Sequence, residues 1–304
     1  MSEACLNPST MRKLSQPRFI AFCAVVFLFL FIAGFQYSSY VSEKERLRNL
    51  QRMPTPRMVI VVTPTYKRFT RIPDMIRMAN TLSHVEHLHW IVIEDGNMTV
   101  PAVENILGRS GLSYTYMAHM TAAGYPRKGW YQRTQALKFI RSNTSQILGD
   151  SEEGVLYFGD DDNSYDIRLF TEYIRNVKKL GMWAVGYVGG GLVEAPKVAN
   201  GVFESFDVKW GAKRKFAVDM AGFAVNLKVV LKSDAVFGTS CKRGLGAPET
   251  CLLEDMGLEK VDIEPFGWQG TKDREIYVWH TKTNDPYIDR RAGEPNSFGY
   301  LVET

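Results

Sequence analysis

The stretch GVLYFGDDDN at residues 154–163 joins an apolar segment to three consecutive carboxylates. Residues 155–158 have the composition of a buried strand, and the glycine after them marks its end. Asp160, Asp161 and Asp162 each resist ionisation beside their neighbours. A solvated acidic loop is one interpretation. Because the triplet directly follows a buried strand, we instead predict a positive partner there, with a divalent cation as the first candidate.

Two further apolar segments end in polar residues in the same way. Residues 58–62 (MVIVV) are followed by Thr63-Pro64-Thr65, and residues 88–93 (LHWIVI) by Glu94-Asp95-Gly96. Apolar residues recur at helical spacing in two other segments, 72–82 and 130–140. This alternation predicts an α/β fold whose mostly parallel sheet is covered by helices on both faces. Ligands gather beyond the carboxyl ends of such strands, so the three polar strand ends should form one site.

The second half of the chain is less regular. Residues 183–187 are predicted as a strand that leads into the turn Gly189-Gly190-Gly191. Residues 276–279 are predicted as a strand that leads into His280. We expect this half to supply a different part of the site.

An unbroken apolar run occupies residues 19–35, at the short end of the length that spans a membrane. Arg12, Lys13 and Arg18 precede it, and by the positive-inside rule they keep the N-terminus in the cytosol. A cleaved signal peptide is the alternative, but the run is longer than a typical signal core and no small-residue cleavage site closes it cleanly. The predicted order is a cytosolic tail (1–18), a signal anchor (19–35), a stem (36–57) and a lumenal domain (58–304).

Charge and cysteine usage constrain the expected partners. The formal net charge is +4 and Lys and Arg form no basic stripe, so nucleic acid is not an expected partner. Cys241 and Cys251, on the predicted lumenal side, are either a disulfide or two free thiols. Asn97 and Asn143 begin N-glycosylation triplets, which are usable only if this side is lumenal.

Within the triplet, the three side chains cannot all point the same way. We expect Asp162 to bind a divalent cation, Mn²⁺ or Mg²⁺, while Asp160 and Asp161 hold waters or nucleotide hydroxyls. Arg127 and Arg133 flank the start of a predicted helix. Their guanidinium groups suit phosphate or carboxylate, although composition alone would make them ordinary surface arginines.

Other candidate residues carry weaker signals. Glu249 stands at a predicted helix start, where a glutamate is usually a surface residue that complements the helix dipole. His280 follows a strand and by itself is more often structural than a ligand. His84, His87 and His89 loosely suggest a metal site. His87 and His89 would share one face of an extended segment without an obvious third ligand or cysteine, so no metal site is predicted there.

Seven motifs together resemble those of the β-1,3-glucuronyltransferases, type II membrane enzymes that carry glucuronate from UDP to a terminal galactose. The motifs run in order from Val61 to Thr283 and are VVTPTYKR, LHWIVIEDGN, PRKGWYQRTQAL, YFGDDDNSYD, VGGGLVEAPKV, VDMAGFAV and VWHTKT. Two stretches depart from the family pattern, namely residues 246–248 ahead of Glu249 and the tail after Thr283.

The resemblance implies a GT-A type fold, with a UDP- and metal-binding half at about 58–165 and an acceptor-binding half at about 166–304. It implies UDP-glucuronate as donor and a galactose-terminated glycan as acceptor, either the Gal-Gal-Xyl linker of proteoglycans or N-acetyllactosamine. A Golgi membrane location and a homodimer are implied as well. The rival interpretations are a catalytically silent lumenal protein that binds sugar or nucleotide, and a metal-dependent phosphohydrolase.

The resemblance also implies roles for single residues. On the donor side, the uridine pocket would contain Pro64, Thr65 and Tyr66, with Asp95 on the uracil. The triplet would contact ribose and manganese, with Asp162 as the metal ligand. Arg127 and Arg133 would face the diphosphate and the donor carboxylate, His280 would reach the diphosphate, and Lys282 occupies a position that is usually basic. On the acceptor side, Glu194, Trp210, Arg214 and Asp219 would bind the sugar, and Glu249 would be the general base of an inverting transfer.

Overall fold

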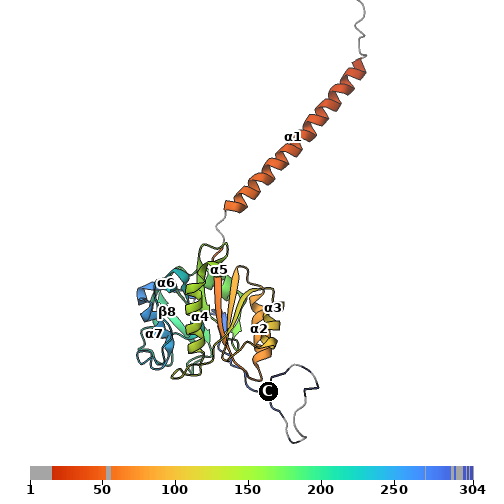
Figure 1. The fold of residues 1–304 in the computed structure, drawn as a ribbon. Coiled ribbons are helices and arrows are strands. Elements are labelled where there is room, and N and C mark those ends of the chain that lie inside the picture. The colour runs from red at the N-terminus through yellow and green to blue at the C-terminus, as the bar shows by residue number, and fades with distance from the viewer. Residues whose placement is uncertain are drawn as a thin grey trace, which may run out of the picture. The chain divides into compact units, whose positions relative to one another are not determined.

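The computed structural model describes residues 16–52, 56–270, 272–288, 291, 297–298, 300 and 302–303. The chain divides into two compact units, Met1–Pro54 and Thr55–Thr304. The first contains helix α1 (Gln16–Arg52; Figure 1), in which Ala24–Lys44 is long and apolar enough to cross a membrane. This helix includes the predicted anchor and most of the predicted stem. Arg12 and Lys13 lie outside the described residues, so the boundaries of tail, anchor and stem stay predictions.

The second unit is built on a seven-stranded sheet in the order β11-β6-β10-β4-β1-β2-β3. Its parallel part consists of β1 (Met58–Thr65), β2 (Leu88–Glu94), β3 (Ser113–Ala118) and β4 (Gly154–Phe158). Beyond β4 the sheet continues with β10 (Phe223–Asn226), β6 (Leu180–Met182) and β11 (Ile263–Pro265), of which β10 runs antiparallel to both of its neighbours. The predicted mostly parallel sheet is confirmed.

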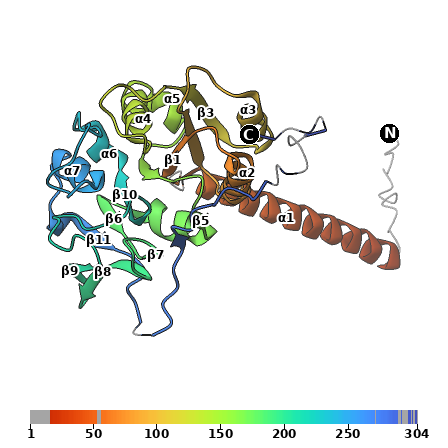
Figure 2. The same ribbon diagram turned by 90° about the horizontal axis from the view of Figure 1, so that it is seen from below.

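Both faces of this sheet are covered, as predicted. In β1, Ile60 and Val62 belong to one core cluster with helix α4 (Trp130–Ser142), because successive strand residues point to opposite faces. Val59 and Val61 belong to a second cluster with α2 (Arg71–Leu82) and α3 (Pro101–Arg109). In Figures 1 and 2, α6 (Leu227–Leu231) and α7 (Pro248–Asp255) lie at the opposite end of the sheet from α2 and α3.

A second sheet has five strands in the order β5-β12-β7-β8-β9, all from the later part of the chain. Its strands are β5 (Ser164–Tyr165), β7 (Val185–Gly186), β8 (Val193–Ala199), β9 (Val202–Asp207) and β12 (Val278–Trp279). The remaining helical segments are short: α5 (Thr144–Leu148), a π-helical turn (Leu169–Tyr173) and 3₁₀ turns at Ile174–Asn176, Met220–Gly222 and Lys260–Asp262.

The single strand predicted at 183–187 is wrong in detail. The chain leaves the large sheet after Met182 and enters the small sheet at Val185. Trp183 lies at the crossing, where its indole N–H donates to the carbonyl of Ala221 at 2.9 Å. Tyr187 has a φ of +59°, which ends the extended run. The apolar composition of 183–187 therefore reflects burial at a junction between two sheets.

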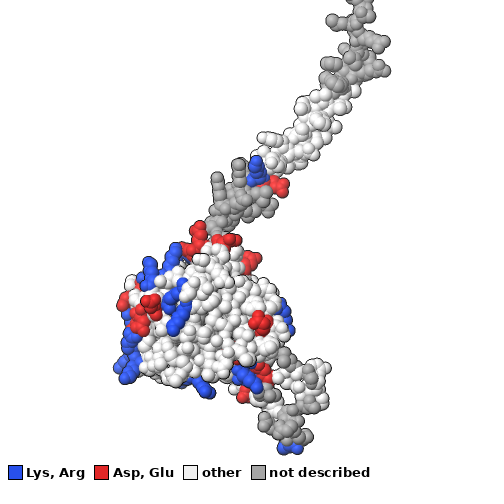
Figure 3. Space-filling view, viewed as in Figure 1, with Lys and Arg blue, Asp and Glu red and all other residues white. Residues whose placement is uncertain are grey.

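Charges of both signs are interspersed on the face of the second unit that Figure 3 shows.

The disulfide that the sequence left open is present between Cys241 and Cys251, whose Cα atoms are 5.9 Å apart.

Gly186 offers a test of how the small sheet holds the segment that leads into His280. It pairs with Trp279, and a Cβ atom there would collide with the Trp279 ring. We expect Gly186→Ala to lower the free energy of unfolding by about 1–3 kcal/mol, the usual effect of overpacking. Gly108→Ala is the matched control. Gly108 lies inside α3, and a Cβ atom there would be 3.9 Å from the Tyr114 hydroxyl, so the substitution should be neutral or slightly stabilising. Urea unfolding of both variants measures the difference, and equal stabilities would contradict the packing argument.

Candidate active site

The aspartate triplet lies just beyond the end of β4, next to the end of β1. Asp161 is 5% exposed and points back to β1, where its carboxylate accepts a hydrogen bond from Thr65 Oγ1 at 2.8 Å. It also forms an ion pair with Arg68 at 2.8 Å. Burial raises the pKa of Asp161 to about 6, and the charge of Arg68 opposes that rise. Both carboxylate oxygens of Asp161 therefore have a protein partner.

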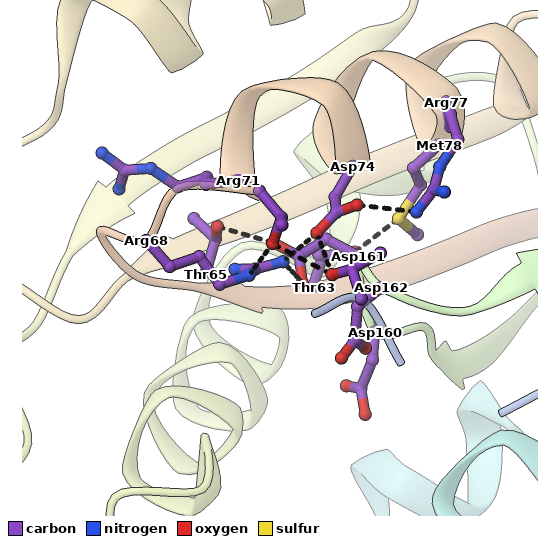
Figure 4. A network of polar contacts seen from close by, with 12 residues as sticks. Thr63, Thr65, Arg68, Arg71, Asp74, Arg77, Met78, Asp160, Asp161 and Asp162 are labelled. Carbon is purple, nitrogen blue, oxygen red and sulfur yellow. Dashed lines mark hydrogen bonds and ion pairs between the residues drawn. The ribbon is translucent and has the colours of Figure 1, made fainter. Parts of the chain in front are cut away.

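Arg68 links the triplet to helix α2 (Figure 4). The same guanidinium group pairs with Asp74 at 2.8 Å, and Asp74 also accepts from Thr283 at 2.7 Å. The side chains of Asp160 and Asp162 are turned away from Asp74 in this view. Sequence reasoning gave Arg68 no role, although it belongs to the VVTPTYKR motif. A signal was present, because a basic residue just after a strand end lies close to the triplet once the two strands pair.

Asp160 has a different cation. Arg133, in the first turn of α4 and 3% exposed, forms an ion pair with it and also donates to the carbonyl of Lys128 at 2.9 Å. Gly129, immediately before the helix, has a φ of +72°, and a Cβ atom there would come within 2.8 Å of both Pro64 and Arg133. A glycine is thus required for α4 to approach the β1 turn this closely.

Asp162 is the one member of the triplet whose carboxylate has no hydrogen-bond or ion-pair partner among the described residues. Burial and the charge of Asp160 raise its pKa, so the site would gain from added positive charge. In the described part of the chain, no three His, Cys, Asp or Glu side chains are grouped to hold a metal ion. A cation at Asp162 would therefore complete its shell with water and substrate oxygens, as Mg²⁺ commonly does at phosphate sites. The residues present fit a divalent cation of that kind.

A cleft of about 680 Å³ opens beside the triplet. It brings together nine of the predicted donor-side residues, Pro64, Thr65, Tyr66, Asp95, Arg127, Arg133, Asp160, Asp161 and Asp162. Asp95 is held by the backbone N–H and the hydroxyl of Thr121, at 2.7 and 2.8 Å. Arg127 is exposed and its side chain has no partner among the described residues. We call this space the donor cleft.

A second cleft of about 640 Å³ contains the other predicted residues, Glu194, Trp210, Arg214, Asp219, Glu249, His280 and Lys282. We call it the acceptor cleft. His280 and Lys282, which were predicted on the donor side, line this cleft. Between them, the Thr281 hydroxyl donates to the backbone carbonyl of Asp162 at 2.9 Å, so this segment joins the two clefts. His280 Nδ1 is 3.5 Å from an Asp219 oxygen, and that carboxylate raises the pKa of His280.

Buried carboxylates dominate the acceptor cleft. Glu249 is 7% exposed and Glu194 4% exposed, and each has one buried oxygen without a hydrogen-bond partner. Burial, reinforced by the charge of Asp219, raises the pKa of Glu249 to about 8, and Arg214 opposes this rise. The guanidinium group of Arg214 lies over the Trp210 ring, 4.5 Å from its centroid. Unpaired buried oxygens of this kind are suited to accepting hydrogen bonds from sugar hydroxyls.

The model of glycosyltransferase family 43 matches residues 78–284 of this chain. The galactosylgalactosylxylosylprotein 3-beta-glucuronosyltransferase sqv-8 of Caenorhabditis elegans is 38% identical over 246 residues, which cover 77% of this chain and 66% of that protein. Galactosylgalactosylxylosylprotein 3-beta-glucuronosyltransferase 1 of Homo sapiens is 39% identical over 240 residues, which cover 75% and 70%. The solved structure of S. aureus TarS 1-349 aligns with a TM-score of 0.45 and 15% identity, covering 74% of this chain and 60% of that one.

The chain belongs to glycosyltransferase family 43, so the resemblance to the β-1,3-glucuronyltransferases is confirmed. The predicted α/β class is confirmed by the two sheets and their helices. The match spans roughly two thirds of the length of these two relatives, 66% and 70%. The roles of single residues stay predictions.

The raised pKa of Glu249 predicts a pH-dependent stability. An ordinary glutamate ionises near 4.5 and the folded one near 8, so between these values the folded state binds more protons than the unfolded state. The contribution of Glu249 to stability is therefore full below pH 4.5 and lost as pH rises to about 8. Because Glu249→Gln cannot ionise, its Tm minus that of the unmodified protein should increase from pH 5 to pH 8. Glu152→Gln, at an exposed position, is the control in the thermal melts. If the difference in Tm between Glu249→Gln and the unmodified protein is the same at pH 5 and at pH 8, the burial argument is contradicted.

Proposed function

We propose that the protein transfers glucuronate from UDP-glucuronate to the 3-hydroxyl of a terminal galactose, with the Gal-Gal-Xyl linker of proteoglycans as first acceptor. The observation that carries this proposal is the pair of adjoining clefts, one beside the triplet and one lined by the buried Glu249. The names of the relatives support the same reaction. Transfer to N-acetyllactosamine is the alternative acceptor.

In this proposal the donor cleft binds UDP. Pro64, Thr65 and Tyr66 would line the uridine pocket, and Asp95, already oriented by Thr121, would accept from the uracil. Asp161 is engaged on both oxygens, so it would fix the turn, while Asp160, paired with Arg133, would face the ribose hydroxyls. Arg127 lines the donor cleft and Lys282 lines the acceptor cleft. Both are exposed cations, suited to binding the diphosphate.

Asp162, with diphosphate oxygens, would hold a divalent cation, Mn²⁺ or Mg²⁺, which when bound stabilises charge on the leaving diphosphate. His280 lies next to this position, and its pKa is raised, so its protonated form is favoured. A protonated His280 would donate a hydrogen bond to the departing phosphate. The hydrogen bond from Thr281 to the Asp162 carbonyl would hold the side chains of His280 and Asp162 in fixed positions relative to each other.

Glu249 would act as the general base. The galactose 3-hydroxyl gives its proton to the carboxylate, its oxygen bonds to the anomeric carbon, and the bond from that carbon to UDP breaks with its electron pair leaving on the diphosphate. A base of this kind typically contributes about 10²–10⁴-fold to the rate. Trp210 would stack on the apolar face of the sugar, and Glu194, Asp219 and Arg214 would fix its hydroxyls.

The location of the active site on the lumenal side of the Golgi membrane belongs to the same proposal. The apolar helix α1 and the Cys241–Cys251 disulfide support it, because disulfides persist in oxidising compartments. Asn97 is exposed, whereas the amide nitrogen of Asn143 donates to the carbonyl of Phe139 at 2.9 Å, so Asn97 is the more accessible acceptor for glycosylation. The homodimer stays a prediction from the resemblance.

An acceptor panel tests the proposed function. Purified protein with UDP-glucuronate and Mn²⁺ is offered Gal-Gal-Xyl and N-acetyllactosamine glycans, and the linkage of each product is determined by NMR. We expect a β-1,3 product on at least one acceptor and none from Glu249→Gln. UDP binding without any product on any acceptor would favour the silent binding protein. Release of inorganic phosphate from UDP would favour the phosphohydrolase.

Asp162→Asn removes the charged oxygen ligand of the proposed cation. We expect transfer to fall by at least about 10²-fold and UDP affinity in Mn²⁺ to weaken, because the cation would bridge protein and diphosphate. In the presence of a chelator, Asp162→Asn and the unmodified protein should bind UDP with the same affinity. Asp166→Asn, whose carboxylate pairs with Arg168 instead, is the matched control and should keep full activity. An Asp162→Asn protein with full activity in chelator would rule out the metal role.

The two arginines of the donor cleft should differ in donor selectivity. A site that distinguishes glucuronate from glucose must leave a buried polar group unpaired when the wrong sugar binds. Arg133 is buried, and although Asp160 and the Lys128 carbonyl engage its terminal nitrogens, its Nε has no partner. Arg127 is exposed. We expect Arg133→Ala to lower kcat/KM for UDP-glucuronate far more than for UDP-glucose, and Arg127→Ala to lower both about equally.

Arg133→Lys is the control for the ion pair with Asp160, because it keeps the positive charge and loses the planar fork. It should recover only part of the preference. Steady-state kinetics with both donors gives the ratio. An unchanged ratio in Arg133→Ala would move the carboxylate contact to Arg127 or His280.

A further inference from the structure

The loop that carries Glu249 is closed by a disulfide. Cys241 begins the loop and is 3% exposed, within the core cluster on the α4 side of the sheet. Cys251 lies in α7, two residues after Glu249. The bridge therefore encloses the whole lead-in at 246–248, where the sequence departs from the family pattern, together with the proposed base.

The enclosed loop is folded tightly against its own bridge. The N–H of Gly246 donates to the carbonyl of Cys241 at 2.9 Å, and the N–H of Ala247 to that of Gly244 at 2.9 Å. A Cβ atom at Gly244 would lie 2.7 Å from the Cys241 sulfur and would also collide with the carbonyl of Ala247. Leu245 and Gly246 both have positive φ, +54° and +95°. For Leu245 this conformation is unfavourable by itself, so the surrounding contacts must hold it.

The Glu249 side chain does little to hold its own position. One of its oxygens is buried without a partner, and burial disfavours its charged form. A carboxylate in this state gains hydration if the loop opens toward water. Its place in the acceptor cleft must therefore be imposed by the backbone on either side. On the C-terminal side the hydroxyl of Thr250 donates to the carbonyl of Phe216 at 2.8 Å, and on the N-terminal side the disulfide fixes the loop.

We propose that Cys241 and Cys251 are positioning residues for the transfer reaction, whose disulfide holds Glu249 in the acceptor cleft. This inference rests on the proposed function. The donor cleft is built by other segments, β1, β2, β4 and α4 with the loops that follow or precede them. Loss of the bridge should therefore impair the chemical step and leave UDP binding intact. Arg243, within the loop, pairs with Asp255 of α7 at 2.7 Å, a contact that does not depend on the disulfide.

The experiment compares the full chain, oxidised and reduced with a phosphine, with the double variant Cys241→Ala/Cys251→Ala. We expect kcat for transfer to fall at least about tenfold on reduction and in the double variant, with UDP affinity in Mn²⁺ changed less than twofold. Reduction should have no effect on the double variant, which serves as the reagent control. Hydrogen exchange should accelerate at residues 242–251 and stay unchanged in β1 and β4.

The pH profile separates positioning from a general loss of structure. Asp219 keeps the pKa of Glu249 high and Arg214 and Arg133 lower it, but burial has the largest effect. If the loop opens, Glu249 is hydrated and the pH at which kcat/KM is half-maximal should fall from near 8 toward the ordinary glutamate value. Unchanged kcat and pH profile without the bridge would overturn the proposal. A parallel loss of UDP affinity and of exchange protection throughout the chain would also overturn it.

The exchange measurement keeps this inference distinct from the proposed function. If no acceptor yields product from the oxidised protein, the function fails, and exchange at 242–251 still shows whether the bridge holds the loop. Faster exchange confined to that loop would support the positioning role of the disulfide. Equal exchange with and without the bridge would overturn it.

Discussion

The structure depends on how three adjacent carboxylates are neutralised at the end of a buried strand. The three carboxylates differ in their partners. Asp161 is paired with Arg68 from the connection between β1 and α2, and Asp160 with Arg133 from the first turn of α4. Asp162 has no ion-pair partner among the described residues. Burial and the charge of Asp160 raise its pKa more than the charges of Arg68 and His280 lower it, so the turn favours one more positive charge there.

Both cations lie close to the start of a helix. Arg68 reaches Asp161 because β1 and β4 pair in a register that sets Val62 beside Phe158, so the last residues of β1 and the turn after them lie beside the triplet. Arg133 reaches Asp160 because Gly129 lets α4 approach the β1 turn closely. The connection that leads into α2 and the first turn of α4, helices on opposite faces of the sheet, thus meet the triplet at one edge. The donor cleft at this edge is lined by both ion pairs, beyond the carboxyl ends of the strands where ligands gather in such sheets.

The sequence was sufficient for the elements around this edge and insufficient for much of the second half. β1, β2, β4, α2 and α4 combine strong periodicity with clear end signals, and their predicted positions agree with the structure to within a few residues. The junction at Trp183 was misread because a chain that crosses between two sheets is as apolar as a strand. Arg68 was missed because its partner in the triplet, Asp161, is distant in sequence. Glu249 has no local feature that marks a base. Family resemblance, and not pattern, selected Glu249.

The acceptor cleft shows a conflict between reactivity and stability. Burial raises the pKa of Glu249 to about 8, which would make it a stronger proton acceptor in the role that we propose, and the same burial favours expulsion of the charged carboxylate into water. A loop held by hydrogen bonds alone can relieve this conflict by opening. In the positioning role that we propose, a covalent bridge across the loop limits that opening, because Cys251 lies in α7 two residues after Glu249. The disulfide is thus placed beside the buried carboxylate that we propose as the base.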